Sequence, residues 1–461
     1  MQNLSSFLQR LGLLSAAAGL LSTSTALAQA PRAFTAGNYV VARVGDGTAA
    51  LTSASTATFL LEYTPAGTLV QTVALPIADT SPNLALTETG TSTVDANLSR
   101  SADGRYLLLT GYNTPPGTAS LSGTTTATVN RVVGRIAASG AINTTTRITD
   151  AFSATTVRGA ASVDGSSFYV VGGNSGVVSV PLGNTAASTG ISTGSPTNDR
   201  AVGISRGNLY VSSGSAPTYG VAQVGTGLPT TASQAQTLLP GFPTGGTTST
   251  TASSYSFLFT DQSTAVAGND VLYVADDGSA TAPAGIQKWS LVSGTWVLNG
   301  TIGTATGTTA VAVRGLTGSQ AGSTVTLVAS SNTGLYTLTD NAGYNVTPST
   351  ATLPAALAIP VTNTAFRGVA LAPVATALAA RPEATQGQLA LYPNPAQDVL
   401  TISLATGSAA GHRAEVRDLL GRTVRAATLP ASGQLSLVGL PAGSYLLTVD
   451  GSLTRRISKV D

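Results

Sequence analysis

A short pattern recurs along residues 33–375 of this chain and restricts its fold more than any other feature. In each copy, an apolar stretch leads through a turn rich in Asp, Gly or Asn into a stronger strand. Copies occupy Ser101–Leu109, Arg158–Val171, Arg200–Val211 and Thr264–Val274. Repeats of about 40–60 residues with four short strands each are typical of β-propellers. We therefore predict an all-β propeller over residues 33–375.

The two ends of this region contain complementary parts of one blade. Arg367–Pro373 copies the first strand of a unit and then stops, whereas Tyr39–Val44, Phe59–Tyr63 and Thr68–Leu75 are three strands without a leading one. A blade built from both ends closes the ring and hides sheet edges that would favour aggregation. The units predict six blades, with room for a seventh in residues 230–262. The region resembles uncharacterised secreted propeller-like proteins, and this resemblance implies the fold only.

The first 30 residues have the pattern of a secretory signal peptide. A polar start ends at Arg10, an apolar run follows from Leu11 to Leu21, and small residues surround Ala28 and Ala30. A membrane anchor needs about 20 apolar residues, and the polar residues 22–25 interrupt this run too early. We therefore predict cleavage after Ala28 or Ala30, an exported chain, and no transmembrane segment in the mature chain.

The last 75 residues form a second predicted domain. Residues 387–461 hold seven basic and five acidic side chains, a charge density above that of the preceding chain, and an Ala/Pro-rich linker at 376–386 separates the two. Five short strand patterns follow, and they predict a small immunoglobulin-like β-sandwich. The expected strands are 399–404, 414–418, 434–437, 444–449 and 456–460.

Three motifs in this domain resemble the C-terminal sorting domain of the type IX secretion system of Bacteroidetes. They are Leu391–Pro395, Asp418–Val424 and Leu440–Tyr445, followed by a basic strand that ends at Lys459. The resemblance implies export through the periplasm and outer membrane by the type IX machinery, then release or attachment at the cell surface. The chain ends at Val460 and Asp461, whereas the family often ends in a longer apolar strand. The alternative to a sorting domain is an immunoglobulin-like domain without a sorting role. The motif residues are Tyr392, Pro393, Asn394, Pro395, Gly421, Gly443, Tyr445 and Lys459.

Composition excludes many chemistries. The chain has no Cys and a single His, His412, which lies outside the propeller region. Lys288 is the one lysine of the propeller region. These facts exclude disulfides, thiolate metal sites, His-based triads and Gly-Lys-Ser/Thr phosphate loops there. With 22 basic and 20 acidic residues, the chain has no basic field for nucleic acid.

Two adjacent carboxylates are the candidate metal ligands. Asp276 and Asp277 follow a predicted blade strand, and Asp270 stands nearby in the sequence. Carboxylates in a loop suit a hard cation such as Ca²⁺, which takes six to eight oxygen ligands. The alternative is a turn with solvated acidic side chains. No cofactor is firmly implied, and Ca²⁺ is the one that these residues allow.

Four arginines are the candidate ligand-binding residues. Arg158, Arg200, Arg314 and Arg367 each stand at the start of a unit's first strand, which is innermost in a propeller. We expect them to meet at one mouth of the central channel, with Asn97 and Ser263 at the corresponding places of the other blades. Such a group favours an acidic ligand. The alternative is structural, with each arginine paired to a nearby acid such as Asp199 and packed between blades.

The remaining candidates leave the function open between two classes. Glu62 and Glu88 are the only glutamates of the propeller region, and neither has an obvious catalytic partner. Aromatic side chains could stack on sugars or fill the core. We favour a non-enzymatic module that binds a surface glycan or protein. The alternative is a Ca²⁺-dependent hydrolase or lactonase at the channel mouth, and a purely structural surface protein is a third class. The aromatic candidates are Tyr112, Tyr219, Trp289 and Trp296.

Overall fold

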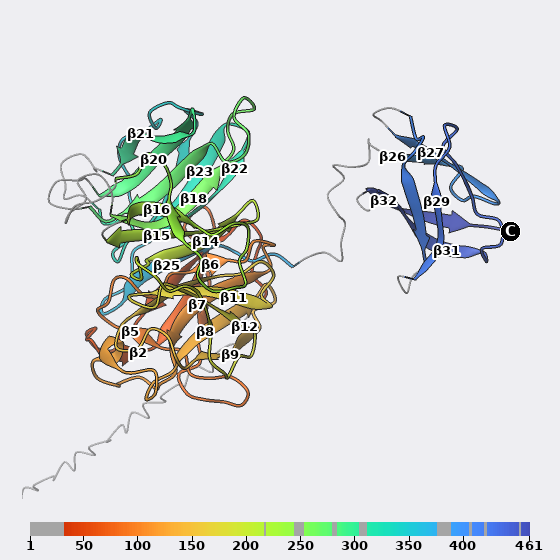
Figure 1. Cartoon of the computed structure of the whole chain (residues 1–461). Coiled ribbons are helices and arrows are strands. Elements are labelled where there is room, and N and C mark those ends of the chain that lie inside the picture. Colours follow the sequence, from red (N-terminus) through yellow and green to blue (C-terminus); the bar gives the residue numbers. More distant parts are fainter. Residues whose placement is uncertain are drawn as a thin grey trace, which may run out of the picture. The chain divides into compact units, whose positions relative to one another are not determined.

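The computed structural model describes residues 32–215, 218–243, 253–278, 284–303, 311–375, 389–404, 408–418, 422–450 and 453–461. The chain divides into two compact units, residues 1–375 and 376–461 (Figure 1). The predicted signal peptide and linker lie outside the described residues. Among the described residues, we find no helix with the length and hydrophobicity of a membrane span.

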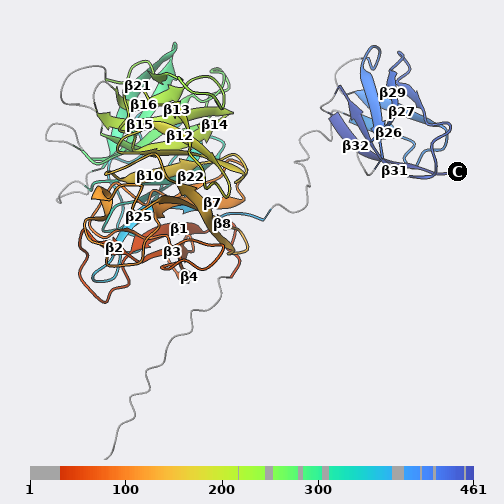
Figure 2. The ribbon, with the colours of Figure 1, turned by 60° about the horizontal axis from the view of Figure 1, so that its bottom comes forward.

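Six antiparallel sheets form the first unit and are its blades (Figure 2). Blade 1 has the order β25 (Ala365–Leu371), β1 (Tyr39–Val44), β3 (Thr58–Tyr63), β4 (Leu69–Ala74). Blades 2 to 6 follow in chain order, and their strands are given from the inner strand outward. Blade 2 has β6 (Ser99–Arg100), β7 (Tyr106–Tyr112), β8 (Arg131–Ala137) and β9 (Ile142–Ile148), and blade 3 has β10 (Val157–Ala161), β11 (Ser167–Gly172), β12 (Val177–Pro181) and β13 (Thr189–Ser192). Blade 4 has β14 (Ala201–Ser205), β15 (Asn208–Ser215), β16 (Thr218–Val224) and β17 (Gln236–Leu238); blade 5 has β18 (Ser254–Thr260), β19 (Val271–Asp276), β20 (Gly285–Val292) and β21 (Thr295–Ile302); blade 6 has β22 (Gly315–Ala321), β23 (Thr324–Ser330) and β24 (Leu335–Asp340). Two short strands, β2 (Ser55–Thr56) and β5 (Glu88–Thr89), pair with each other, and η1 (Leu121–Gly123) is a single 3₁₀ turn.

The ring closes as the sequence predicts. Strand β25 pairs antiparallel with β1, from Tyr39 opposite Leu371 to Val44 opposite Ala365. The C-terminal strand of the unit is therefore the inner strand of a blade whose other three strands come from the N-terminal end. Joining the first and last segments in one sheet gives blade 1 its fourth strand and covers the inner edge of β1 with β25.

Hydrophobic side chains fill the space between each pair of neighbouring blades. Alternate residues of a strand face opposite sides of the sheet, so one strand supplies two cores. In β1, Val40 and Ala42 pack toward blade 2, whereas Tyr39 and Val41 pack toward blade 6. Six such clusters connect the six sheets in a ring.

Residues 230–262 contribute to two blades rather than to a seventh one. They supply β17, the outer strand of blade 4, and β18, the inner strand of blade 5. The expectation that Thr264–Asp270 begins a unit is wrong for this reason, because these residues belong to the turn between β18 and β19. Asp270 is fully buried there, and its carboxylate accepts hydrogen bonds from the backbone N–H groups of Gln262 and Ser263.

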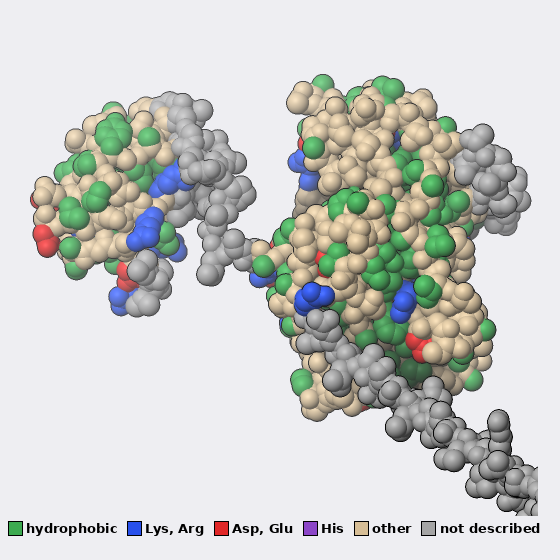
Figure 3. All heavy atoms as spheres, turned by 180° about the vertical axis from the view of Figure 1, so that it is seen from behind, with side chains coloured by type: hydrophobic (Ala, Val, Ile, Leu, Met, Phe, Trp, Pro, Cys, Tyr) green, Lys and Arg blue, Asp and Glu red, His purple; other side chains and the backbone are tan. Residues whose placement is uncertain are grey.

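The second unit contains two sheets around one core. One sheet has the order β26 (Leu389–Tyr392), β27 (Val399–Leu404), β30 (Gln434–Ser436); the other has β29 (Thr423–Thr428), β28 (Arg413–Arg417), β31 (Gly443–Val449), β32 (Leu453–Lys459). Leu400 and Leu435 of the first sheet share a core with Val416 and Leu447 of the second. The β-sandwich is confirmed, but β26 and β29 were not predicted. Figure 3 shows few charged side chains on the propeller face turned to the viewer.

Candidate functional site

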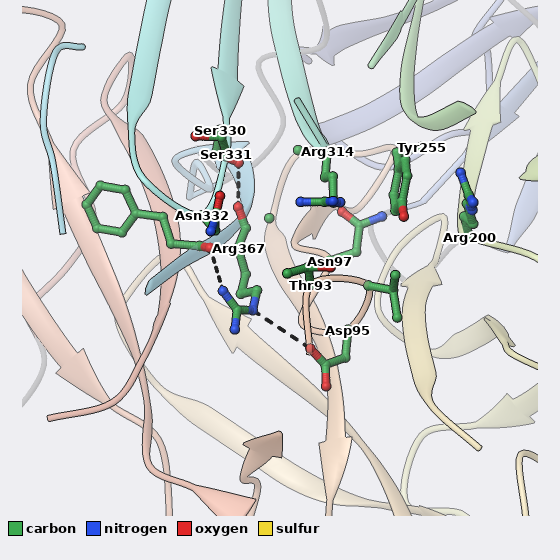
Figure 4. Close-up of a pocket in the computed structure, with 14 residues that line it drawn as sticks. Thr93, Asp95, Asn97, Arg200, Tyr255, Arg314, Ser330, Ser331, Asn332 and Arg367 are labelled. Carbon is green, nitrogen blue, oxygen red and sulfur yellow. Dashed lines mark hydrogen bonds and ion pairs between the residues drawn. The ribbon is translucent and has the colours of Figure 1, made fainter. Parts of the chain in front are cut away.

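A pocket lies where the inner strands of the propeller begin. Three of the four predicted arginines line it, namely Arg200, Arg314 and Arg367. The pocket is small, with a cavity volume of about 20 Å³, and Asn97 and Tyr255 also line it (Figure 4). The structure thus brings three of the four arginines, from three different blades, to one pocket, whereas Arg158 does not line it.

Arg200 and Arg314 hold one aromatic ring and one carboxylate between them. The guanidinium carbon of Arg200 lies 4.3 Å from the centre of the Tyr255 ring, and that of Arg314 lies 5.4 Å from it. Figure 4 shows Tyr255 between the two arginines. Arg314 donates from Nε (3.2 Å) and Nη2 (3.1 Å) to Asp277 Oδ2, and Arg200 Nη1 lies 3.8 Å from Asp277 Oδ1. The Asp277 carboxylate thus interacts with both guanidinium groups.

A glycine makes room for Arg200. A Cβ atom on Gly214 would lie 2.3 Å from the guanidinium carbon of Arg200, a distance that real Cβ contacts do not reach. The guanidinium is therefore stacked between the backbone at Gly214 and the ring of Tyr255, and Ser253 Oγ accepts its 2.8 Å hydrogen bond. This packing fixes the direction of the charged group without neutralising it.

Arg158 has only neutral partners among the described residues. It donates to Thr156 Oγ1 (3.0 Å), Asn198 Oδ1 (2.6 Å) and the backbone oxygen of Asp199 (3.0 Å). Burial and then the positive charge of Arg200 lower the pKa of Arg158. The structural alternative, in which the Asp199 carboxylate pairs with Arg158, is therefore not what forms. That carboxylate accepts instead from Gln236 Nε2 at 2.8 Å.

Arg367 is the most enclosed of the four. Its side chain is 3% exposed, and it donates to the backbone oxygens of Phe366 (3.0 Å) and Gly90 (2.8 Å). Its Nε lies 3.8 Å from Asp95 Oδ1, a distance too long for a hydrogen bond. Arg367 therefore forms part of the pocket floor, whereas Arg200 and Arg314 remain partly open to solvent.

In the other two blades, Asn97 and Ser263 were expected to correspond to these arginines, and only Asn97 does. Asn97 lines the pocket as predicted. Ser263 does not, because it lies in the turn after β18, and Tyr255 occupies the expected place. The missed signal was the aromatic-rich run Tyr255–Phe259, which marks the inner strand of blade 5 more clearly than residues 264–270 do.

The two predicted metal ligands have protein partners. Asp276 is fully buried, and its carboxylate accepts from Ser253 N (2.6 Å), Gly278 N (2.8 Å) and Gln287 Nε2 (2.9 Å). Burial raises the pKa of Asp276 to about 6. The positive charges next to Asp277 disfavour a cation there. The described residues contain no group of three acidic, His or Cys side chains that could hold a metal ion.

The other candidates from the sequence are structural. Glu62 is fully buried and accepts from Thr35 N, Asn38 Nδ2 and Gln71 Nε2, each at 2.7 Å. Of the two alternatives for the aromatic side chains, stacking on sugars or filling the core, the structure shows the core one, because each side chain is at most 5% exposed. These are Tyr112, Tyr219, Trp289 and Trp296.

In the second unit, the sorting-motif residues connect the two ends of the sandwich. Asn394 accepts from Ser458 N at 2.8 Å and donates to the Arg456 backbone oxygen at 3.1 Å. Tyr445 donates to the Pro441 backbone oxygen at 2.7 Å. Lys459 lies in β32, opposite Gly443 of β31. The Asn394 contacts fasten the first motif to the last strand, whereas Gly421 lies outside the described residues.

Comparison with known families now applies to this unit. Residues 390–460 match the family model of the secretion system C-terminal sorting domain. This unit is a secretion-system sorting domain. The sorting domain marks the chain as cargo of the type IX secretion system, exported to the cell surface or released. A search of curated proteins found no match to the chain.

Solved structures of low identity resemble the chain. PorZ, a surface component of the type IX secretion system of Porphyromonas gingivalis, is 12% identical with a TM-score of 0.32, over 88% of this chain and 64% of that one. The chain thus spans less than two thirds of PorZ. A putative 6-phosphogluconolactonase of Bacteroides fragilis is 10% identical with a TM-score of 0.37, over 87% of this chain and 98% of that one. At these values the similarity says nothing about ligand or activity.

Proposed function

We propose that the propeller is a binding module, carried out of the cell by the sorting domain, whose channel mouth takes an acidic group of its ligand. The observation that supports this most is the imbalance of charge at Arg158, Arg200 and Arg314. Among the described residues, Arg200 and Arg314 share the single carboxylate of Asp277, and Arg158 forms no ion pair. The ligand class is an acidic glycan or an acidic protein segment at the cell surface.

The geometry supports a carboxylate in particular. Arg314 already binds the Asp277 carboxylate, with two of its nitrogens donating to the one oxygen Oδ2, so a guanidinium–carboxylate contact forms at this mouth. Arg158 keeps a positive charge with only neutral acceptors. An incoming anion would lower the repulsion between Arg158 and Arg200, which is greatest where water is excluded.

A Ca²⁺-dependent hydrolase or lactonase at Asp276 and Asp277 has less support. All hydrogen bonds of Asp276 go to protein donors, and Asp277 is placed between two arginines. A catalytic cation would have to displace both sets of partners. We therefore propose binding without turnover at this mouth.

The test uses D-glucuronate and oligogalacturonate as acidic probes and glucose as the neutral one. Binding to the folded state raises the unfolding midpoint, by about 2.7 kcal/mol of stabilisation at a hundredfold excess over Kd. We expect a shift with the acidic probes that Arg158→Gln and Arg314→Gln abolish. Arg206→Gln is the control, because Arg206 is half exposed and pairs with Asp261 on the surface. Binding that survives in Arg158→Gln and Arg314→Gln, or no shift with any acidic probe, would contradict the proposal.

A further inference from the structure

A second and larger cavity lies along the axis of the propeller, beyond the arginine pocket. Its volume is about 280 Å³, against about 20 Å³ for the pocket at the mouth. On blade 5, Tyr255 lines the pocket, whereas Phe257 and Leu258, farther along the same inner strand, line the cavity. This cavity is the channel of the propeller. Because a cavity of about 150 Å³ can hold a benzene molecule, the channel has room for a larger organic ligand.

One cation lines the channel, and it has no acidic partner. Arg100 of β6 is the only charged residue among the described residues that line this cavity. Its Nη1 donates to the backbone oxygen of Ala372 at 3.2 Å, and its other N–H donors have no partner among the described residues. The acid nearest to it in the sequence, Asp103, pairs instead with Arg105 at 2.5 Å. Burial lowers the pKa of Arg100, and no neighbouring charge offsets this effect. The guanidinium is therefore a partly buried positive charge without a counterion.

Apolar side chains face the same space. Ile204, Phe257, Leu258 and Leu371 line the channel, and each of them stays partly exposed although it is apolar. They belong to the inner strands of blades 4, 5 and 1, past the residues that line the mouth. Blade 6 adds Thr317, which is also partly exposed and whose hydroxyl has no partner among the described residues. A ligand that covers these apolar side chains removes their surface from water, which favours binding.

We propose that the channel binds a small amphipathic monocarboxylate, an organic acid with one carboxylate and an apolar body. The carboxylate accepts hydrogen bonds from the guanidinium of Arg100, which supplies the positive charge of the channel. The apolar body covers the side chains of Phe257 and Leu258. A ligand with two or more negative charges is disfavoured, because its second charge would lack a partner in a partly buried space.

This site is separate from the acidic-ligand site proposed at the mouth. Arg200 and Arg314 line the pocket but not the channel, and Arg100 lines the channel but not the pocket. The two sites also differ in chemistry, since apolar side chains make up much of the channel wall. Each site can therefore be changed without altering the other, and failure of one proposal leaves the other standing.

The experiment uses the purified full chain with 3-phenylpropionate and hexanoate as probes. The matched neutral probe is 3-phenylpropanamide, which has the same apolar body without the charge. We expect the two acids to bind with one-to-one stoichiometry in isothermal titration calorimetry and to raise the unfolding midpoint, because a ligand of the folded state stabilises it. The amide should bind about tenfold more weakly than 3-phenylpropionate, since it loses a hydrogen bond between charged groups.

Two variants locate the binding site. Arg100→Gln should reduce the affinity for 3-phenylpropionate to that for the amide, because the charge that distinguishes them is gone. Thr317→Phe should abolish binding of both acids, because the larger ring fills the channel. The control is Arg105→Gln, since Arg105 is partly exposed, pairs with Asp103 and does not line the channel. Its affinity for the acids should equal that of the original protein.

The readout is the difference with and without probe, so a variant that is merely less stable still reports on the site. Three results would each overturn the proposal: no binding of either acid, equal affinity for 3-phenylpropionate and its amide, or binding that survives Arg100→Gln or Thr317→Phe. Loss of 3-phenylpropionate binding in Arg314→Gln would place the carboxylate at the mouth instead and would also overturn it.

Discussion

Ser256 donates a 3.1 Å hydrogen bond to the side-chain oxygen of Asn97, from the inner strand of blade 5 to the segment that leads into β6 of blade 2. These blades are opposite each other in a ring of six, so the bond crosses the mouth of the channel. The arginine pocket lies on one side of it. On the other side is the channel, with a cavity volume of about 280 Å³, and Ser99 and Thr317 are among the residues that line it. The bond therefore separates the pocket from the channel.

Ser256→Ala tests the strength of this contact. The serine is 7% exposed, and its loss leaves the Asn97 oxygen without that donor. We expect the free energy of unfolding to fall by about 1 kcal/mol, the usual value for one such bond. Chemical denaturation of Ser256→Ala, Asn97→Ala and the double variant gives the coupling between them. A coupling energy of zero would show that the two side chains do not interact in solution.

Gly368→Ala should weaken the seam at which the ring closes. A Cβ at this position would lie 2.0 Å from the backbone nitrogen of Leu98, where β25 of blade 1 meets blade 2. Backbone must shift to admit the methyl group, at a cost of about 1–3 kcal/mol or more. Thermal unfolding would show a lower midpoint. Gly194→Ala is the control, because a Cβ there meets nothing within 4 Å, and its midpoint should stay close to that of the original protein.

Asp340→Asn should be strongly destabilising. Lys288 Nζ lies 2.8 Å from Asp340 Oδ2, both side chains are fully buried, and Tyr273 also donates to this carboxylate at 2.7 Å. Removing the negative charge leaves a buried ammonium unpaired, at a cost of about 3–5 kcal/mol. Asp261→Asn at the exposed Arg206 pair should cost only about 0–1 kcal/mol. Equal losses in the two variants, measured by denaturant unfolding, would refute this distinction.

Asp199 should make the protein less stable as the pH rises from about 4 to 7. Burial raises the pKa of Asp199 from 3.8 to about 7. Between these values the folded state binds a proton that the unfolded state has released, so the free energy of unfolding falls with increasing pH, by up to about 1.4 kcal/mol per unit. Below pH 4 and above pH 7 this group contributes no slope. Asp199→Asn should flatten the profile in that window, and an unchanged slope would contradict the assignment.

Parts of the fold could be predicted because they depend on local patterns. Alternation of apolar residues identifies β1, β7 and β11, and the incomplete units at the two ends predict closure of blade 1. Blade 5 was placed wrongly at its first strand, because residues 264–270 contain Ala and Val in a turn whose shape is set by the buried Asp270 carboxylate. No local pattern distinguishes that turn from a strand.

The sequence by itself determined the β-propeller class, the sorting domain and the positions of four arginines at the starts of inner strands. Each follows from periodicity or motif order within a short stretch of chain. Only the tertiary structure decided which charges meet: Asp277 with Arg200 and Arg314, and Arg367 with Asp95 and Glu88. These partners lie up to about 280 residues apart, Glu88 and Arg367 being the farthest. Their contact depends on how the blades pack against one another, because burial and distance set the energy of a charge pair, and no local sequence pattern gives either.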